Sequence, residues 1–145
     1  MTEIKFFFNA PNKINTACQL AKRAYDGGKK LVLYAPDVAI AQALDRALWT
    51  FSAASFLPHV FADSANAAAT PILIATENSP DATFPHMEAL LSLSDAPPPF
   101  FSRFDFLREV VSTADDDRAH ARERLKFYRS RGFEINTLDL NNNVK

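Results

Sequence analysis

Apolar residues in the first half of the chain follow two different spacings. The run EIKFFF at 3–8 is typical of a buried strand, and KKLVLYA at 29–35 predicts a second one. Between them, apolar residues recur every three or four positions from Lys13 to Tyr25, which is the spacing of one buried helix face. Asp37 is a suitable N-cap for a further helix. The apolar stripe of that helix consists of Val38, Ala41, Leu44 and Leu48.

The second half adds further strands and one late helix. Two apolar runs, PILIAT at 71–76 and ALLSLSD at 89–95, are separated by a polar loop that contains proline. FLREVVST at 106–113 predicts a last strand, and a charged helix over about 115–131 precedes a short tail. This order predicts an α/β fold with three layers, α/β/α, around a largely parallel sheet of about five strands. We expect a single domain over 1–145, because no linker or repeat divides the chain.

Composition and charge narrow the classes of function. The 145 residues are 48% hydrophobic and carry a formal net charge of −1, so overall charge gives no case for nucleic-acid binding. The single cysteine, Cys18, cannot form an internal disulfide, and its place on the first helical stripe predicts a buried, unreactive thiol. No apolar run approaches the roughly 20 residues of a membrane span, and no signal-peptide pattern opens the chain. We therefore expect a cytoplasmic protein with no membrane contact.

Motifs for cofactor binding and catalysis are missing from the sequence. Its three glycines cannot form a glycine-rich phosphate loop, and GGKK at 27–30 precedes a strand rather than a helix. His59, His86 and His120 are far apart and lack metal-ligand spacing. The aspartates at 115–117 are explained by helix capping and the helix dipole. We expect no cofactor, no metal and no catalytic activity of the chain by itself.

The late helix concentrates basic residues on one side. At 100° per residue, four of them share one face, and we name them the cationic stripe: Arg118, Arg122, Lys126 and Arg129. An apolar face lies beside them, which we expect to pack on the sheet: Ala114, Ala121, Leu125 and Tyr128. Three other residues are expected to point away into solvent: His120, Arg124 and Arg131.

Such a border between basic and apolar residues suits a ligand with both negative charge and a hydrophobic anchor. An acidic peptide that ends in an apolar residue and a carboxylate has this character, since arginine binds carboxylates in a bidentate manner. Three alternatives remain at this point. The helix could be a solvated one whose long basic side chains cover apolar surface. Single-stranded nucleic acid could bind directly through 118–131, although no exposed aromatic residues interleave with the bases. An α/β enzyme with an unrecognised site at the carboxyl ends of the strands is the third.

Two separated segments of the chain resemble the chi subunit of bacterial DNA polymerase III. They are ALDRALWTFSAASFLPH at 43–59 and ARERLKFYRSRGFEINT at 121–137. The resemblance spans nearly the whole chain, although 62–88 carries no diagnostic residue. It implies a fold similar to a nucleotide-binding fold without the phosphate loop. It also implies a non-catalytic accessory subunit of the polymerase holoenzyme that acts in DNA replication.

The resemblance further implies two protein partners and no direct, specific DNA binding. The family pairs with the psi subunit, which tethers it to the clamp loader. It also binds the acidic C-terminal tail of single-stranded-DNA-binding protein, which ends in Pro-Phe and a free carboxylate. The tail site would comprise Arg118, Arg122, Leu125, Lys126 and Trp49, with leucine at position 125 where the family has tyrosine. The psi-binding surface would comprise Phe56, Leu57, Pro58 and His59.

Overall fold

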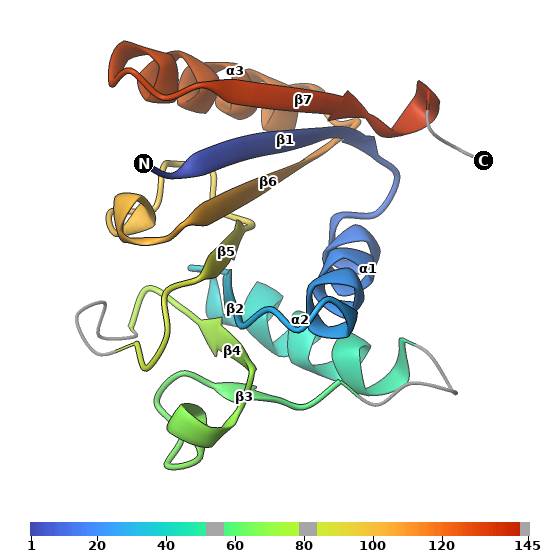
Figure 1. Ribbon diagram of the computed structural model, residues 1–145. Helices are drawn as coiled ribbons and strands as arrows, with labels where there is room; N and C mark the ends of the chain where they lie inside the picture. The colour runs from blue at the N-terminus through green and yellow to red at the C-terminus, as the bar shows by residue number, and fades with distance from the viewer. Residues whose placement is uncertain (52–56, 79–83, 143–145) are drawn as a thin grey trace.

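A computed structural model describes residues 1–51, 57–78 and 84–142 of the chain (Figure 1). The strands in this part are β1 (Glu3–Ala10), β2 (Leu31–Tyr34), β3 (His59–Phe61), β4 (Ile72–Ala75), β5 (Ala89–Ser92), β6 (Phe106–Ser112) and β7 (Ile135–Asp139). The α-helices are α1 (Lys13–Asp26), α2 (Val38–Thr50) and α3 (Asp115–Ser130).

The seven strands form one sheet in the order β3-β4-β2-β5-β6-β1-β7, and every neighbouring pair is parallel. α1 and α2 cover one face of this sheet, and α3 covers the other, so the predicted α/β/α architecture is confirmed (Figure 1). None of the helices in the described ranges is long and apolar enough to cross a membrane.

The prediction of about five strands is wrong by two, because both edge strands were missed. β3 has only three residues, and β7 reads INTLD, in which no two apolar residues are adjacent. An edge strand pairs on one side only and is partly exposed, so it does not need the continuous apolar run that a central parallel strand has. The five central strands carry such runs and were all predicted.

The ends of α1 and α2 follow local capping rules. Asp37 accepts a hydrogen bond from the Ala39 backbone N–H at 2.8 Å, which confirms it as the N-cap of α2, and Asn12 caps α1 by accepting from Asn15 N–H at 3.0 Å. Cys18 is buried on α1, which confirms the expected burial, and burial raises the pKa of its thiol to about 11, which disfavours the reactive thiolate. Tyr25, in contrast, is exposed at the last turn of α1.

The two faces of the sheet have different cores. The α1 and α2 side is largely aliphatic, whereas the α3 side is rich in aromatic residues. α3 packs mainly on β6 and β7 and reaches β1 through the contacts of Arg124 and Tyr128 with the Phe6 ring, and the loop between β5 and β6 covers part of the remainder. That loop brings Phe100, Phe101 and Phe104 into the core, and the Phe101 ring lies 4.9 Å from the ring of Tyr128 on α3. The loop therefore covers part of this face of the sheet, as a second helix would.

A buried polar network attaches α3 to the sheet. Arg124 is only 1% exposed, and its Nε donates to Glu109 Oε1 of β6 at 3.1 Å, while its Nη1 donates to the Asp95 carbonyl at 3.0 Å. Tyr128 donates its hydroxyl proton to Glu109 Oε2 at 2.5 Å. Burial raises the pKa of Glu109 to about 7, although Arg124 and the Tyr128 hydroxyl act in the opposite direction. The prediction that Arg124 is solvated is wrong, because a buried carboxylate in the middle of a strand requires a cationic partner.

Loss of the Arg124 side chain should therefore destabilise the fold severely. We expect Arg124→Leu to lower the free energy of unfolding by about 3–5 kcal/mol at pH 8, because Glu109 then remains buried without its counter-charge. This decrease in the free energy of unfolding should be smaller at pH 6 than at pH 8, since protonation neutralises Glu109. Urea denaturation of the variant at both pH values measures this. Arg122→Leu on the exposed side of the same helix is the matched control and should cost less than about 0.5 kcal/mol.

Of the three aspartates at the start of α3, Asp117 has a tertiary role. It is buried, accepts from the Ser112 backbone N–H at 2.7 Å, and pairs with Lys13 Nζ of α1 at 3.2 Å. Burial alone would raise the pKa of Asp117, but the hydrogen bond from Ser112 and the charge of Lys13 together hold it below the usual range. A single carboxylate thus connects α3, the end of β6 and α1.

This connection should make stability depend on pH on the acidic side. The pKa of Asp117 is lower in the folded chain than in the unfolded chain, so its ionised carboxylate stabilises the fold at pH values above the unfolded-state pKa. This stabilisation is lost as the pH falls through the folded-state pKa. We expect the free energy of unfolding to fall less steeply in Asp117→Asn than in the wild type between about pH 5 and pH 3. Parallel slopes in chemical denaturation series at these pH values would contradict the assignment.

Candidate protein-binding surfaces

The cationic stripe lies on the solvent side of α3. All four of its side chains are exposed, while Ala121 and Tyr128 are buried against the sheet and Leu125 is half-buried at the border. The packed face is thereby confirmed except for Ala114, which is the exposed N-cap residue of the helix. Within the described part of the chain, Arg118, Arg122 and Arg129 make no ion pair. Lys126 lies 3.5 Å from Glu123, but both side chains are highly exposed, so this pair is weak.

The end of β7 adds an acidic residue beside the first turn of α3. Asp139 accepts hydrogen bonds from Asn9 Nδ2 and from the Asn141 backbone N–H, each at 2.9 Å. These bonds, together with the charge of Arg118, hold the pKa of Asp139 below its usual range, so it is ionised at neutral pH. An anionic ligand therefore meets repulsion from Asp139 at the Arg118 end of the stripe. Asp139 was not predicted to lie here, because its segment was assigned to a tail after the helix.

Trp49 is not brought to the cationic stripe. It is 53% exposed near the end of α2, which packs on β3 and β4, whereas α3 packs on β6 and β7 on the opposite face of the sheet (Figure 1). The sheet order places β3 and β7 at opposite edges with five strands between them. The expectation that Trp49 belongs to the same pocket as Arg122 is therefore corrected. Its ring lies 4.7 Å from the ring of His59 instead.

The residues expected to bind psi lie next to Trp49, but two of them are buried in the chain itself. Leu57 is 2% exposed, and His59 is 5% exposed with its Nε2 3.2 Å from Asp45 Oδ1. Pro58 is half-buried, and Phe56 lies outside the described residues. The expectation that Leu57 and His59 themselves face a partner is corrected: both side chains belong to the core beneath the surface that contains Trp49 and Pro58.

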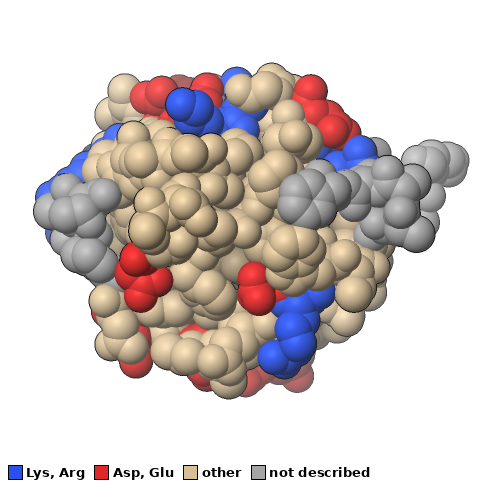
Figure 2. All heavy atoms as spheres, turned by 90° about the horizontal axis from the view of Figure 1, so that it is seen from below, with Lys and Arg blue, Asp and Glu red and all other residues tan. Residues whose placement is uncertain are grey.

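The β3 end of the molecule carries few charges (Figure 2), although Asp45 and Arg46 lie one turn before Trp49 on α2. Figure 2 views the molecule from the β3 end, and most of the face that it shows carries neither acidic nor basic side chains. We name the exposed and half-buried residues here the β3-edge surface: Trp49, Pro58, Val60 and Phe61. An apolar surface at the open edge of a sheet is typical of a protein–protein contact.

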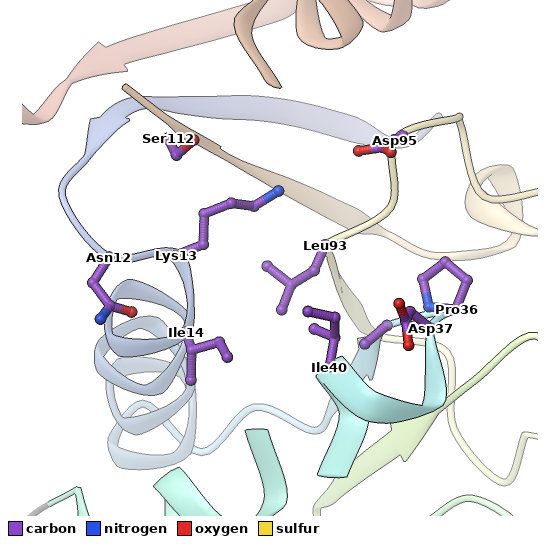
Figure 3. Close-up of a pocket in the computed structure, with 10 residues that line it drawn as sticks. Asn12, Lys13, Ile14, Pro36, Asp37, Ile40, Leu93, Asp95 and Ser112 are labelled. Atoms are coloured by element: carbon purple, nitrogen blue, oxygen red, sulfur yellow. The ribbon is translucent and has the colours of Figure 1, made fainter. Parts of the chain in front are cut away.

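A cavity of about 570 Å³ lies at the carboxyl edge of the sheet, between the first turns of α1 and α2 (Figure 3). Ligands of doubly wound folds bind at this position. Here, however, the side chains of Asn12 and Asp37 already cap the two helices, and Lys13 is paired with Asp117. The carboxylates of Asp37 and Asp95 also line the cavity and would repel a phosphate. In 1–51, 57–78 and 84–142, no group of three acidic, histidine or cysteine side chains could hold a metal ion.

Comparison with known proteins gives a consistent result. The family described as DNA polymerase III chi subunit, HolC, matches residues 1–136. The DNA polymerase III subunit chi of Pseudomonas aeruginosa is 28% identical over 139 residues, which cover 93% of this chain and 94% of the relative. The subunit chi of Escherichia coli is 32% identical over 120 residues, which cover 83% of this chain and 80% of the relative. Because the family match extends over almost the whole chain, the chain belongs to the DNA polymerase III chi subunit family.

Proposed function

We propose that this chain is a non-catalytic accessory subunit of the replicative polymerase that works in the cytoplasm. It pairs with psi and links the clamp loader to the C-terminal tail of single-stranded-DNA-binding protein. The observation that carries the tail-binding part is the cationic stripe, in which three arginines are exposed and have no intramolecular ion pair in the described chain. An acidic ligand from another protein supplies the missing carboxylates.

The chemistry of the tail matches this side of α3. Arg122 is near the middle of the stripe, where its guanidinium is free to bind a terminal carboxylate through two hydrogen bonds. Half-buried Leu125 provides an apolar wall beside it for the phenylalanine of the tail. Asp139 disfavours acidic groups at the Arg118 end. The tail is therefore expected to use mainly Arg122, Lys126 and Leu125, with Arg118 in a minor role.

The β3-edge surface is the contact proposed for psi. It contains an exposed tryptophan, a residue type enriched among interface hot spots, on a face of the molecule that is largely without charge (Figure 2). Trp49 is accordingly assigned to psi rather than to the tail. Since this surface and the cationic stripe lie at opposite edges of the sheet, both partners can bind at the same time, as a linking subunit requires.

Direct binding of single-stranded nucleic acid is the less favoured alternative. Such sites stack bases on exposed aromatic rings between basic residues. Phe127 on the same helix is half-buried and has the Arg131 guanidinium 4.9 Å from its ring centre, and Tyr128 is fully buried. The ring face of Phe127 is therefore already occupied.

Replacement of Arg122 tests the tail site. We expect Arg122→Ala to weaken binding of an acidic peptide that ends in Pro-Phe and a free carboxylate by about 1.5–3 kcal/mol, the scale of a hydrogen bond to a charged group. Arg131→Ala, at the end of the same helix, removes the same charge away from the stripe and should leave the affinity within about twofold. Isothermal titration calorimetry measures both. Equal affinity of Arg122→Ala and the wild type would refute the site, and tight binding of an oligothymidine by the wild type would favour the nucleic-acid alternative.

Replacement of Trp49 tests the psi surface separately. We expect Trp49→Ala to weaken the complex with psi by about 2 kcal/mol or more, because a large aromatic anchor is removed from an apolar interface. Tyr25→Ala, which removes another exposed aromatic side chain at the end of α1, is the control and should bind psi normally. Biolayer interferometry measures the psi affinity of both variants and the wild type. Unchanged psi affinity of Trp49→Ala would place the interface elsewhere.

A further inference from the structure

One part of the sheet on the α1 side is lined by basic and aromatic side chains instead of an aliphatic helix contact. Parallel sheets are normally covered on both faces. Near the amino ends of β1 and β6, the side chains on this face are Lys5, Phe106 and Arg108. The side of α1 near its C-terminus borders this area and leaves a cavity of about 280 Å³.

We name this cavity the basic pocket. Its floor is apolar, and four cationic side chains stand around it: Lys5, Arg23, Lys29 and Arg108. The aromatic rings position three of these cations. Lys29 Nζ lies 4.8 Å and the Arg108 guanidinium 5.3 Å from the Phe106 ring centre, and Lys5 Nζ lies 5.2 Å from that of Phe7. Cation–π contacts of this kind hold the charges beside the cavity instead of leaving them free in solvent.

The positive charge of the pocket is only partly neutralised. Arg108 pairs with Glu3 at 3.0 Å, and Lys29 lies 3.9 Å from Glu88. Lys5 and Arg23 make no ion pair with any residue in the described ranges. Four cations and two carboxylates leave two positive charges around an apolar cavity, so an anionic partner with an apolar group is complementary to it.

We propose that the basic pocket binds an acidic peptide segment of a partner protein, with one apolar side chain in the cavity and flanking carboxylates on Lys5 and Arg23. The cavity of about 280 Å³ has room for one apolar side chain, and the cations around it can pair with the flanking carboxylates. The cations already cover the Phe106 ring, and Phe7 is buried, so neither ring is available for base stacking. This site is independent of the cationic stripe, which lies on the opposite face of the sheet.

A peptide without a terminal carboxylate distinguishes the two surfaces. The probe is a fluorescein-labelled Asp-Asp-Phe-Asp-Asp peptide with an amidated C-terminus, titrated with the full chain at low salt and followed by fluorescence anisotropy. We expect saturable binding that weakens at least about tenfold when Lys5→Ala and Arg23→Ala are combined, because two charge-assisted hydrogen bonds are lost.

Two further variants serve as controls. The combined Arg122→Ala and Lys126→Ala variant removes the same charge from α3 and should bind within about twofold of the wild type. Lys5→Gln with Arg23→Gln keeps more of the side-chain packing and should give the same loss, which guards against a folding defect.

Several results would overturn the proposal. These are no saturable binding to the wild type, an equal loss in the α3 variant, or unchanged affinity in both pocket variants. Equal binding of a peptide with serine in place of phenylalanine would show that the cavity takes no part. Displacement of the probe by an oligothymidine more readily than by unlabelled peptide would make the surface a nucleic-acid site. The tail site is tested separately, by the free-carboxylate peptide and Arg122→Ala.

Discussion

The buried pair of Glu109 and Arg124 determines which side of α3 faces solvent. At 100° per residue, the four side chains of the cationic stripe lie about 120–200° around the helix from Arg124. Because Arg124 is held against β6, the stripe must point outward, and Leu125, at about 100°, must lie at the border. Tyr128 adds a second contact to the same carboxylate. The orientation of the proposed binding surface thus depends on the buried ion pair between Glu109 and Arg124. A rotation of α3 about its axis would separate this pair and leave a buried charge without its partner.

Sheet order then separates the surfaces that this helix and α2 present. The chain enters the sheet in the interior, at β1, and the two strands added at the edges are β3 and β7. α2 lies beside one edge and α3 beside the other, on opposite faces. The parallel sheet keeps the cationic stripe and the β3-edge surface apart without a flexible linker. Under the proposed function, this arrangement would let two partners bind without steric conflict between them.

Local sequence patterns predicted the central strands and the three helices, since each carries an apolar run or stripe of its own. They did not predict β3 and β7, because edge strands are short or half-exposed. Arg124 was misplaced because a helical wheel assigns charged residues to solvent, although Glu109 in the middle of FLREVVS was a signal that a buried cation was needed. Trp49 was misplaced for a different reason. Its distance from α3 depends on the order of strands in the sheet, which no local spacing contains.

The electrostatics of the chain are governed by where charges lie and not by their sum. With a formal net charge of −1, the whole molecule exerts little long-range attraction on any partner. Basic side chains gather on α3 and around the basic pocket, while Asp37 and Asp95 line the cavity at the carboxyl edge of the sheet. Salt screens interactions beyond about 8–10 Å under ordinary conditions, so each basic patch acts only on groups close to it. The acidic segments proposed for the two patches would consequently be recognised through local contacts, in which an apolar residue adds burial to the pairing of the carboxylates.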